Sequence, residues 1–201
     1  MSSDLTARPS PGGDPAPIAE LIAGGTLDAE LAARLWVLLD GGLPLVVAST
    51  SATAGERLAA ALAELSVVAA PAQLVVADSL EGVLATFSGS PTGPIPDPAR
   101  GLGLVVVVRE LARARERVMA AHYIRPVERD AAGHLQRRPP ALLAAHDQAS
   151  DQLEHFAWAI GPELAERIGS GVADYERAIG EREGFLSALC AAGRSPKAAP
   201  N

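Results

Sequence analysis

The residues most able to do chemistry lie between an apolar run and an amphipathic segment. Residues 44–48 (Pro-Leu-Val-Val-Ala) are typical of a buried strand, and residues 49–55 are Ser, Thr, Ala and one Gly. Residues 56–65 then have the apolar spacing of a helix. A strand, a loop of small residues and a helix together suit phosphate binding, because small side chains let backbone N–H groups point at an anion beside the positive helix end.

The same stretch lacks the side chains that nucleotide-binding loops use. The pattern Gly-x-x-x-x-Gly-Lys-Ser/Thr supplies a lysine for the phosphates and a hydroxyl for Mg²⁺, whereas Glu56 and Arg57 stand near those positions here. A carboxylate about 4 Å from a phosphate costs roughly 4 kcal/mol at a surface-like dielectric constant. The residues alone therefore favour an ordinary strand–turn–helix connection, in which Thr53 and Glu56 form a capping box.

The amino-acid composition excludes further kinds of reaction and of binding site. The chain has 201 residues and a net charge of -7, and of its 17 basic residues 16 are Arg and one is Lys197. A mechanism that needs an internal lysine is therefore excluded. The acidic balance and an aromatic content of 3% predict no nucleic-acid binding. The single cysteine, Cys190, excludes an internal disulfide and a multi-cysteine metal site, and we interpret it as a packed thiol.

The remaining polar residues form no catalytic or metal-binding pattern. The four histidines show no i, i+4 pair and no zinc motif, so we predict no metal site; they are His122, His134, His146 and His155. Charge is uneven, with 3 Arg and 11 acidic residues in 1–99, 9 Arg and 4 acidic residues in 100–138, and 5 basic and 9 acidic residues in 139–201. The basic middle segment would suit an anionic partner, but we favour a solvated hairpin face.

These elements predict an α/β domain with a mixed sheet. Strands are expected near residues 44–49, 73–77, 103–109 and 116–124, the last two antiparallel, with short strands at 142–143 and 153–158. Helices are expected near residues 27–40, 56–65, 80–87, 162–168 and 172–192. Thr26 and Ser79 are the expected N-caps of the first and third helices.

The chain ends are expected to differ from this domain. Residues 1–17 are rich in Pro, Gly, Ser and Asp and lack the apolar segment of a signal peptide, so we expect a disordered arm and a cytoplasmic protein. No apolar run is long enough to span a bilayer. We therefore expect an α/β domain over residues 18–160, a C-terminal helical segment over 161–193 and a tail over 194–201.

Several short motifs follow one another in an informative order. They are residues 18–26 with the helix after them, Leu45 to Leu62, Val-Ala-Asp-Ser at 76–79, the paired segments 102–113 and 116–123, and residues 181–193. Together, over about residues 18–193, they resemble the bacterial type II/IV secretion-system ATPases, with the Flp (tight-adherence) pilus assembly branch as the best match. Residues 45–62 resemble the P-loop region of that family, and residues 76–79 its His box. The resemblance implies a truncated P-loop NTPase-like (RecA-like) fold.

The departures from the family pattern coincide with its catalytic parts. The Walker lysine falls on Gly55 or Glu56, the following Ser/Thr on Glu56 or Arg57, and the His-box histidine on Val76. Where the family carries its acidic box and Walker B segment, this chain has a short connector with no acidic residue between Ser66 and Ala77. The resemblance thus implies a vestigial phosphate loop with no catalytic residue, made of Thr50, Ser51, Thr53, Gly55, Glu56 and Arg57.

Three hypotheses follow from the sequence. The first is a non-hydrolysing relative of these ATPases that needs no cofactor and binds an intact secretion or pilus ATPase or a pilus assembly protein, meeting the membrane only through partners; a gene remnant would look the same. The second is an ATP-binding or ATP-hydrolysing enzyme with Mg²⁺, in which Thr53, Gly55 and Arg57 hold the phosphates. The third is a small binding domain whose likeness to the family is architectural only.

Overall fold

A computed structural model describes residues 17–66, 72–88, 102–111, 115–129, 133–136 and 138–193. The expected N-terminal arm up to residue 16, the tail at 194–201 and the Pro/Gly-rich stretch at 89–101 lie outside the described residues. The described ranges contain every segment in which the sequence predicts a strand or a helix.

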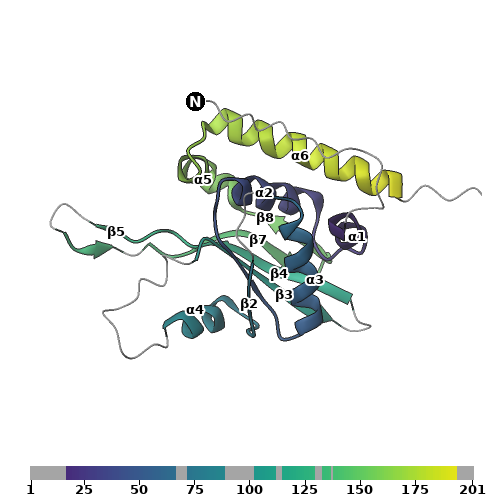
Figure 1. Cartoon of the computed structure of the whole chain (residues 1–201), viewed down its shortest axis with the longest axis horizontal. Coiled ribbons are helices and arrows are strands. Elements are labelled where there is room, and N and C mark those ends of the chain that lie inside the picture. Colours follow the sequence, from purple (N-terminus) through teal and green to yellow (C-terminus); the bar gives the residue numbers. More distant parts are fainter. Residues whose placement is uncertain are drawn as a thin grey trace, which may run out of the picture.

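The fold is built on a six-stranded mixed sheet with the strand order β2-β1-β3-β4-β7-β8 (Figure 1). The parallel strands are β1 (Leu45–Ala48), β2 (Gln73–Val75) and β3 (Leu104–Leu111). The antiparallel half continues from β3 through β4 (Arg115–Tyr123), β7 (Ala141–Asp147) and β8 (Gln152–His155). A separate antiparallel pair, β5 (Glu128–Arg129) and β6 (Leu135–Gln136), projects from one end. The mixed α/β sheet that the sequence predicted is confirmed.

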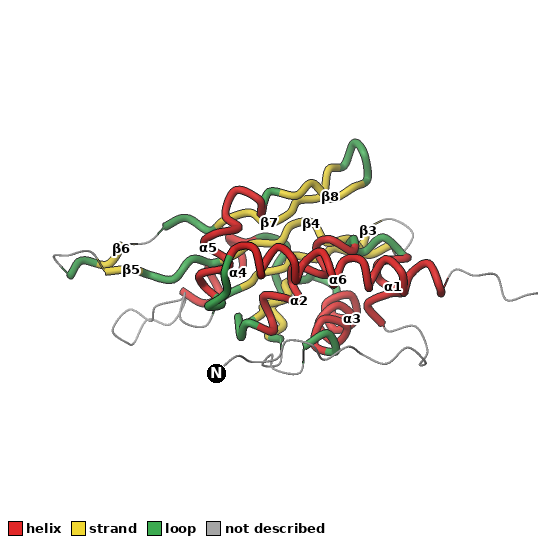
Figure 2. The backbone as a smooth tube through the Cα atoms, turned by 90° about the horizontal axis from the view of Figure 1, so that it is seen from above, coloured by secondary structure: helices red, strands yellow, loops and turns green. Residues whose placement is uncertain are grey.

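Helices cover both faces of this sheet unequally (Figure 1). One face carries α1 (Pro17–Ala23), α2 (Ala29–Asp40) and α3 (Ala52–Ala63), with α5 (Gly161–Arg167) and α6 (Val172–Gly193) outside them. The other face carries α4 (Leu80–Ser88). Viewed from above in Figure 2, α3 lies at one side of the molecule and the β7–β8 pair at the other, in agreement with the strand order.

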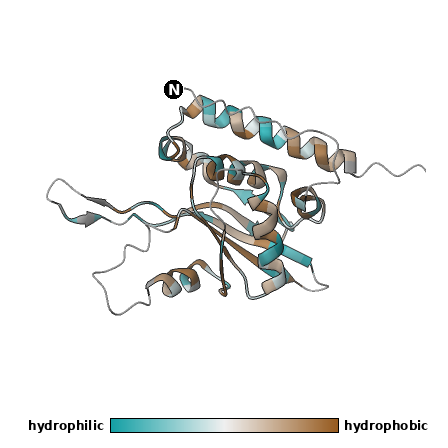
Figure 3. Cartoon of the chain, in the orientation of Figure 1, coloured by the Kyte–Doolittle hydropathy of each residue, from teal (hydrophilic) through white to brown (hydrophobic). Residues whose placement is uncertain are grey.

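The side chains of the central strands alternate between the two faces of the sheet, and each face packs against its own helical layer. Leu45 and Val47 of β1 belong to the larger core cluster under α2 and α3, whereas Val46 and Ala48 belong to the smaller cluster with Val83 of α4. Successive side chains of a strand point to opposite faces, so a run of apolar residues is what a doubly covered strand requires. In Figure 3 the central strands are accordingly mostly brown, while α6 alternates between brown and teal along its length.

The connections between the parallel strands diverge at β1. From β1 the chain passes through α3 to β2 on one side, and from β2 it passes through α4, on the opposite face, to β3 on the other side of β1. In open α/β sheets, ligands bind outside the carboxyl ends of the strands, at the point where the connections from neighbouring strands leave in opposite directions. The carboxyl ends of β1 and β3 are therefore the place to look for a site.

Helix α6 is held to α2 by a mixed polar and aromatic contact. Arg182 donates to Asp40 Oδ2 at 2.7 Å, and its guanidinium lies 5.0 Å from the centroid of the Trp36 ring. Phe185 meets the same ring edge-to-face at 6.1 Å. Tyr175 and Leu186 of α6 are buried in the larger core cluster. The expected C-terminal helices at 162–168 and 172–192 are thus present, and the second packs across the helical layer.

Two local predictions in this part of the chain are wrong, and a third is confirmed. Thr26 does not cap α2; Asp28 does, accepting from Leu31 N–H at 2.8 Å, because Thr26 is buried and its own N–H bonds the Leu21 carbonyl that closes α1. The predicted strand at 153–158 ends at His155, since residues 157–160 form a 3₁₀ turn. Ser79 is confirmed as the cap of α4, accepting from Gly82 N–H at 3.3 Å.

Candidate functional site

The connection from β1 to α3 is only three residues long. β1 ends at Ala48 and α3 begins at Ala52, leaving Ser49, Thr50 and Ser51 between them. Ser51 is the N-cap of α3, and its hydroxyl oxygen accepts from Ala54 N–H at 3.5 Å. The predicted capping box is therefore wrong: Thr53 is the second residue of the helix and has no capping role.

Helix formation takes up the residues that would form an open phosphate loop. Ala52, Thr53 and Ala54 make the first turn of α3, and Gly55 N–H donates to the Ser51 carbonyl at 3.1 Å, an intrahelical bond. Alanine is the strongest helix former, and a serine cap completes the helix start. The N–H groups of Ala54 and Gly55, which would face an anion in an open loop, are thereby committed to the cap and to the helix.

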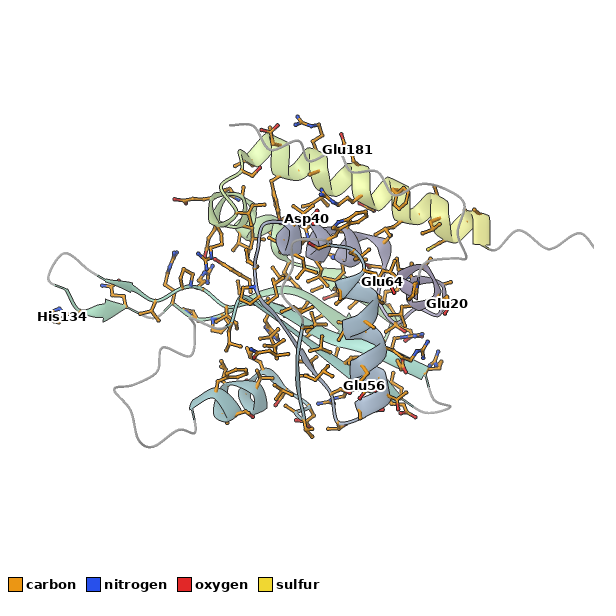
Figure 4. All side chains as sticks on the ribbon, in the orientation of Figure 1. Glu20, Asp40, Glu56, Glu64, His134 and Glu181 are labelled. Atoms are coloured by element: carbon orange, nitrogen blue, oxygen red, sulfur yellow. The ribbon has the colours of Figure 1, made fainter. Side chains whose placement is uncertain are left out.

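A small cavity lies beside this helix start, between α3 and β2. It has a volume of about 190 Å³ and is lined by Ser49, Ser51, Gly55 and Glu56 on one side and Leu74 and Val76 on the other, among others. Sites for small molecules and cofactors usually enclose about 300–1,000 Å³. The cavity is therefore small for a nucleotide, and the one ionisable group that the described residues contribute to its lining is a carboxylate. Figure 4 shows Glu56 at the N-terminal end of α3.

Gly55 allows α3 to pack closely against the sheet at this place. A Cβ atom built on Gly55 would lie 3.3 Å from the Ser49 Cβ and 3.7 Å from Leu74 Cδ2. Helix α3 thus approaches the ends of β1 and β2 too closely for a larger residue to fit without movement. The glycine that the sequence suggests as part of a phosphate loop lets the helix pack on the sheet.

The structure brings only some of the predicted site residues together. Ser51, Gly55 and Glu56 line the cavity, whereas Thr50 and Thr53 are exposed. Arg57 is turned toward β4 and donates to Glu116 Oε1 at 3.1 Å. The cation that the second hypothesis places at the phosphates is therefore engaged elsewhere.

Two further residues complete this edge, and the sequence did not identify either. Glu110 Oε2 accepts from the Ser51 hydroxyl at 3.1 Å, and Arg109 Nη2 donates to the Asp78 carbonyl at 2.8 Å. Arg109 also lies 3.6 Å from the Asp78 carboxylate. Both residues follow the apolar run of β3, but only the strand order shows that β3 lies next to β1. Side chains from β3 thus cross the carboxyl ends of β1 and β2.

A second polar cluster lies at the β7–β8 turn, away from this edge. Asp151 Oδ1 lies 3.0 Å from His146 Nε2 and 3.4 Å from Arg117 Nε, and Arg115 approaches the same carboxylate at 3.4 Å. Hydrogen bonds from Arg117 and His146 lower the pKa of Asp151 to about 2. Arg117 is buried and also donates to the Gly24 carbonyl at 2.9 Å. The cluster therefore ties the turn to β4 and to the end of α1.

A third cluster joins β8 to the start of α2. His155 Nε2 lies 2.8 Å from Asp28 Oδ2, and its Nδ1 lies 3.4 Å from Glu30 Oε1. The hydrogen bond to Asp28 raises the pKa of His155. Burial raises the pKa of Asp28, but hydrogen bonds from His155 and Leu31 N–H outweigh it and the net shift is downward. This geometry is that of an ion pair that fixes the edge strand β8.

Comparison with known proteins identifies no family for this chain. The chain matches no protein-family model and no curated protein sequence. None of the helices in the described ranges combines the length and the apolar character needed to cross a membrane. Among the described side chains, no group of three or more His, Cys, Asp or Glu is placed to hold a metal ion. Function has therefore to be inferred from the geometry of the site.

Proposed function

We propose that this chain is a catalytically degenerate relative of the type II/IV secretion ATPases, close to the Flp pilus assembly branch, that works as a non-hydrolysing assembly or partner-binding module. Its sheet would then be a truncated P-loop NTPase-like (RecA-like) sheet. The observation that carries the proposal is the start of α3 at Ala52, three residues after β1, within the segment aligned with the phosphate loop.

The residues at this edge do not fit Mg-ATP. The Ser51 hydroxyl caps α3 and donates to Glu110, so it is already engaged where a metal-ligand hydroxyl would be needed. The only lysine in the chain is Lys197, far from the loop in sequence. Glu56 adds a negative charge to the cavity wall. Phosphoryl transfer depends on positioning and charge stabilisation, and this donor set supplies neither.

The proposal includes a class of partner. An intact secretion or pilus ATPase, or another pilus assembly protein, is the expected partner, with no nucleic acid and with membrane contact only through that partner. The acidic balance of the chain, with 24 acidic against 17 basic residues, argues against a nucleic-acid surface. The third hypothesis, an unrelated small binding domain, expects a different partner and makes no prediction about nucleotide binding.

One observation favours the alternative, an ATP-binding or hydrolysing secretion ATPase with an atypical loop. The buried Nε of Arg109 has no hydrogen-bond partner among the described residues, and Arg109 lies at the sheet edge where a ligand would be expected. In this alternative Arg109 would hold the phosphate in place of Arg57, because it keeps its Nε unpaired within the described residues, beside its contacts with Asp78, whereas Arg57 is turned toward Glu116.

Calorimetry with ATP and Mg²⁺, followed by a phosphate-release assay, tests the proposal. We expect no saturable heat and no phosphate above a protein-free blank. Saturable binding that Arg109→Ala abolishes and Arg57→Ala leaves intact would favour the alternative. Co-purification with an intact secretion ATPase, but not with an unrelated hexameric ATPase, would separate the proposal from the third hypothesis.

A further inference from the structure

The outer edge of β2 presents backbone groups that point away from the sheet. Within the described residues, β2 is the last strand on its side and pairs with β1 alone, in the register Val46 with Gln73, Val47 with Leu74 and Ala48 with Val75. Ser49 N–H donates to the Val75 carbonyl at 3.0 Å, so residue 75 faces β1. Because neighbouring residues of a strand direct their N–H and C=O groups to opposite sides, those of Leu74 face outward.

The side chains on this edge are unusually apolar for an exposed position. Leu74 is 50% exposed and Val76 is 86% exposed, and no residue from 73 to 76 carries a charge. Edge strands are normally protected by charged side chains, proline or bulges, but the register of β2 with β1 is regular. At the opposite edge, β8 exposes Gln152 and Glu154, which is the usual protection.

Two carboxylates lie close to the β2 strand. Glu56 lines the cavity beside Leu74 and Val76, and Asp78 follows the strand with its side chain 62% exposed and 3.6 Å from Arg109. A second copy of this chain pairing edge to edge would bring like charges together, which destabilises a strand pair. A segment flanked by Lys or Arg would be attracted to the same carboxylates.

We propose that the open edge of β2 binds an extended apolar segment of another protein, flanked by Lys or Arg, which adds to the sheet as a further strand beside Leu74. The inference rests on the proposed function, since it names the surface and the chemistry by which a partner-binding module would recognise its partner. In this mode the main chain gives affinity, and the side chains and flanking charges give specificity.

A fluorescent peptide of alternating Val and Thr with two Lys at each end tests this edge by anisotropy. We expect saturable binding with a dissociation constant below about 1 mM. An otherwise identical peptide with Glu in place of Lys should bind at least about tenfold more weakly. Amide exchange should show new protection at Leu74 in the complex. No saturable binding, or equal binding of the two peptides, would overturn the proposal.

Two variants separate the backbone and charge contributions. Leu74→Pro removes an N–H that faces outward, a position where an edge strand accommodates proline, and should weaken binding at least about tenfold. Glu56→Gln should weaken it about threefold, whereas Glu64→Gln, which removes the same charge at the other end of α3, should have no effect (Figure 4). Equal effects of the two Gln variants would contradict the assigned charge site.

A modified peptide covers the case in which Leu74→Pro does not fold. N-methylation of every second amide in the basic peptide keeps its charge and removes the N–H donors along one edge of the bound strand. Two such peptides, methylated at odd or at even positions, should therefore differ, and only the one that loses the donors facing β2 should bind more weakly. A dimer of the free chain that Leu74→Pro abolishes would identify a second copy as the occupant and overturn the choice of partner. None of these readouts involves nucleotide, so their failure is distinct from a failure of the ATP experiments.

Discussion

The Ser51 hydroxyl donates to Oε2 of Glu110 at 3.1 Å, across 59 positions of sequence. Ser51 is the N-cap of α3 and Glu110 lies near the end of β3, so the contact joins the first crossover helix to a strand two connections later. A single side chain therefore caps the helix and bridges two strand ends at the edge where ligands bind in open α/β sheets.

Ser51→Ala should destabilise the chain more than Thr53→Ala does. Loss of a serine cap costs about 1 kcal/mol, and the bond to Glu110 adds to it, while Thr53 is exposed in the first turn and makes no cap. Urea unfolding followed by circular dichroism should show a lower midpoint for Ser51→Ala at an unchanged slope. A larger effect of Thr53→Ala would instead support the capping box that the sequence suggests.

Ser51 and Thr53 show where prediction from sequence ends. Thr53 and Glu56 fit a local capping pattern, and the pattern alone cannot reveal that Ser51 has a second partner 59 residues away. Arg57 likewise pairs with Glu116, equally distant along the chain. Most of the expected strands and helices follow from local periodicity and are confirmed, as is the cap at Ser79, but the strand expected to run to residue 158 ends at His155. The site depends on which strands are neighbours, and no local pattern encodes that.

The His155–Asp28 pair should make stability depend on pH with a defined sign. The pKa of His155 is raised in the folded state, so its contribution is fully present below its unfolded pKa and is lost as pH rises through the folded pKa. The lowered pKa of Asp28 gives a contribution present above its unfolded pKa and lost as pH falls through the folded one. The pair therefore contributes most between these limits, at about pH 4.5–6.

Urea unfolding of the wild type and of His155→Gln at two pH values checks this sign. The stability difference between the two proteins should be larger at about pH 6 than at about pH 9, because the imidazolium that Asp28 stabilises is lost at the higher pH. An unchanged difference at both pH values would show that His155 acts only through packing.

Asp151 should titrate well below an ordinary aspartate. Its pKa is lowered to about 2 by hydrogen bonds from Arg117 and His146, and it keeps a left-handed backbone at φ 54° to hold them. Carbon-detected NMR of the carboxyl group should place the titration near that value in the wild type. In Arg117→Gln the pKa of Asp151 should rise toward its usual range, while Arg177→Gln on α6, whose partner is Asp174, should leave it unchanged.

Gly103→Ala should destabilise the sheet at the amino end of β3. A Cβ on Gly103 would lie 2.8 Å from Pro44 Cδ and 3.0 Å from the Pro44 carbonyl oxygen, and neither the ring nor the backbone can turn away. Leu104 N–H donates to that same carbonyl at 2.8 Å, so the alignment of β3 with β1 depends on the close approach. Forcing an extra carbon into such a contact costs about 1–3 kcal/mol.

Gly184→Ala is the matched control for this change. Gly184 lies exposed within α6, and no described residue lies within 4 Å of a Cβ built there. The same substitution should therefore stabilise the helix by up to about 1 kcal/mol. Thermal unfolding should thus move in opposite directions for the two variants, downward for Gly103→Ala and upward for Gly184→Ala. Since both exchange one hydrogen for a methyl group, movement in the same direction would mean that the contact with Pro44 does not limit the position of β3.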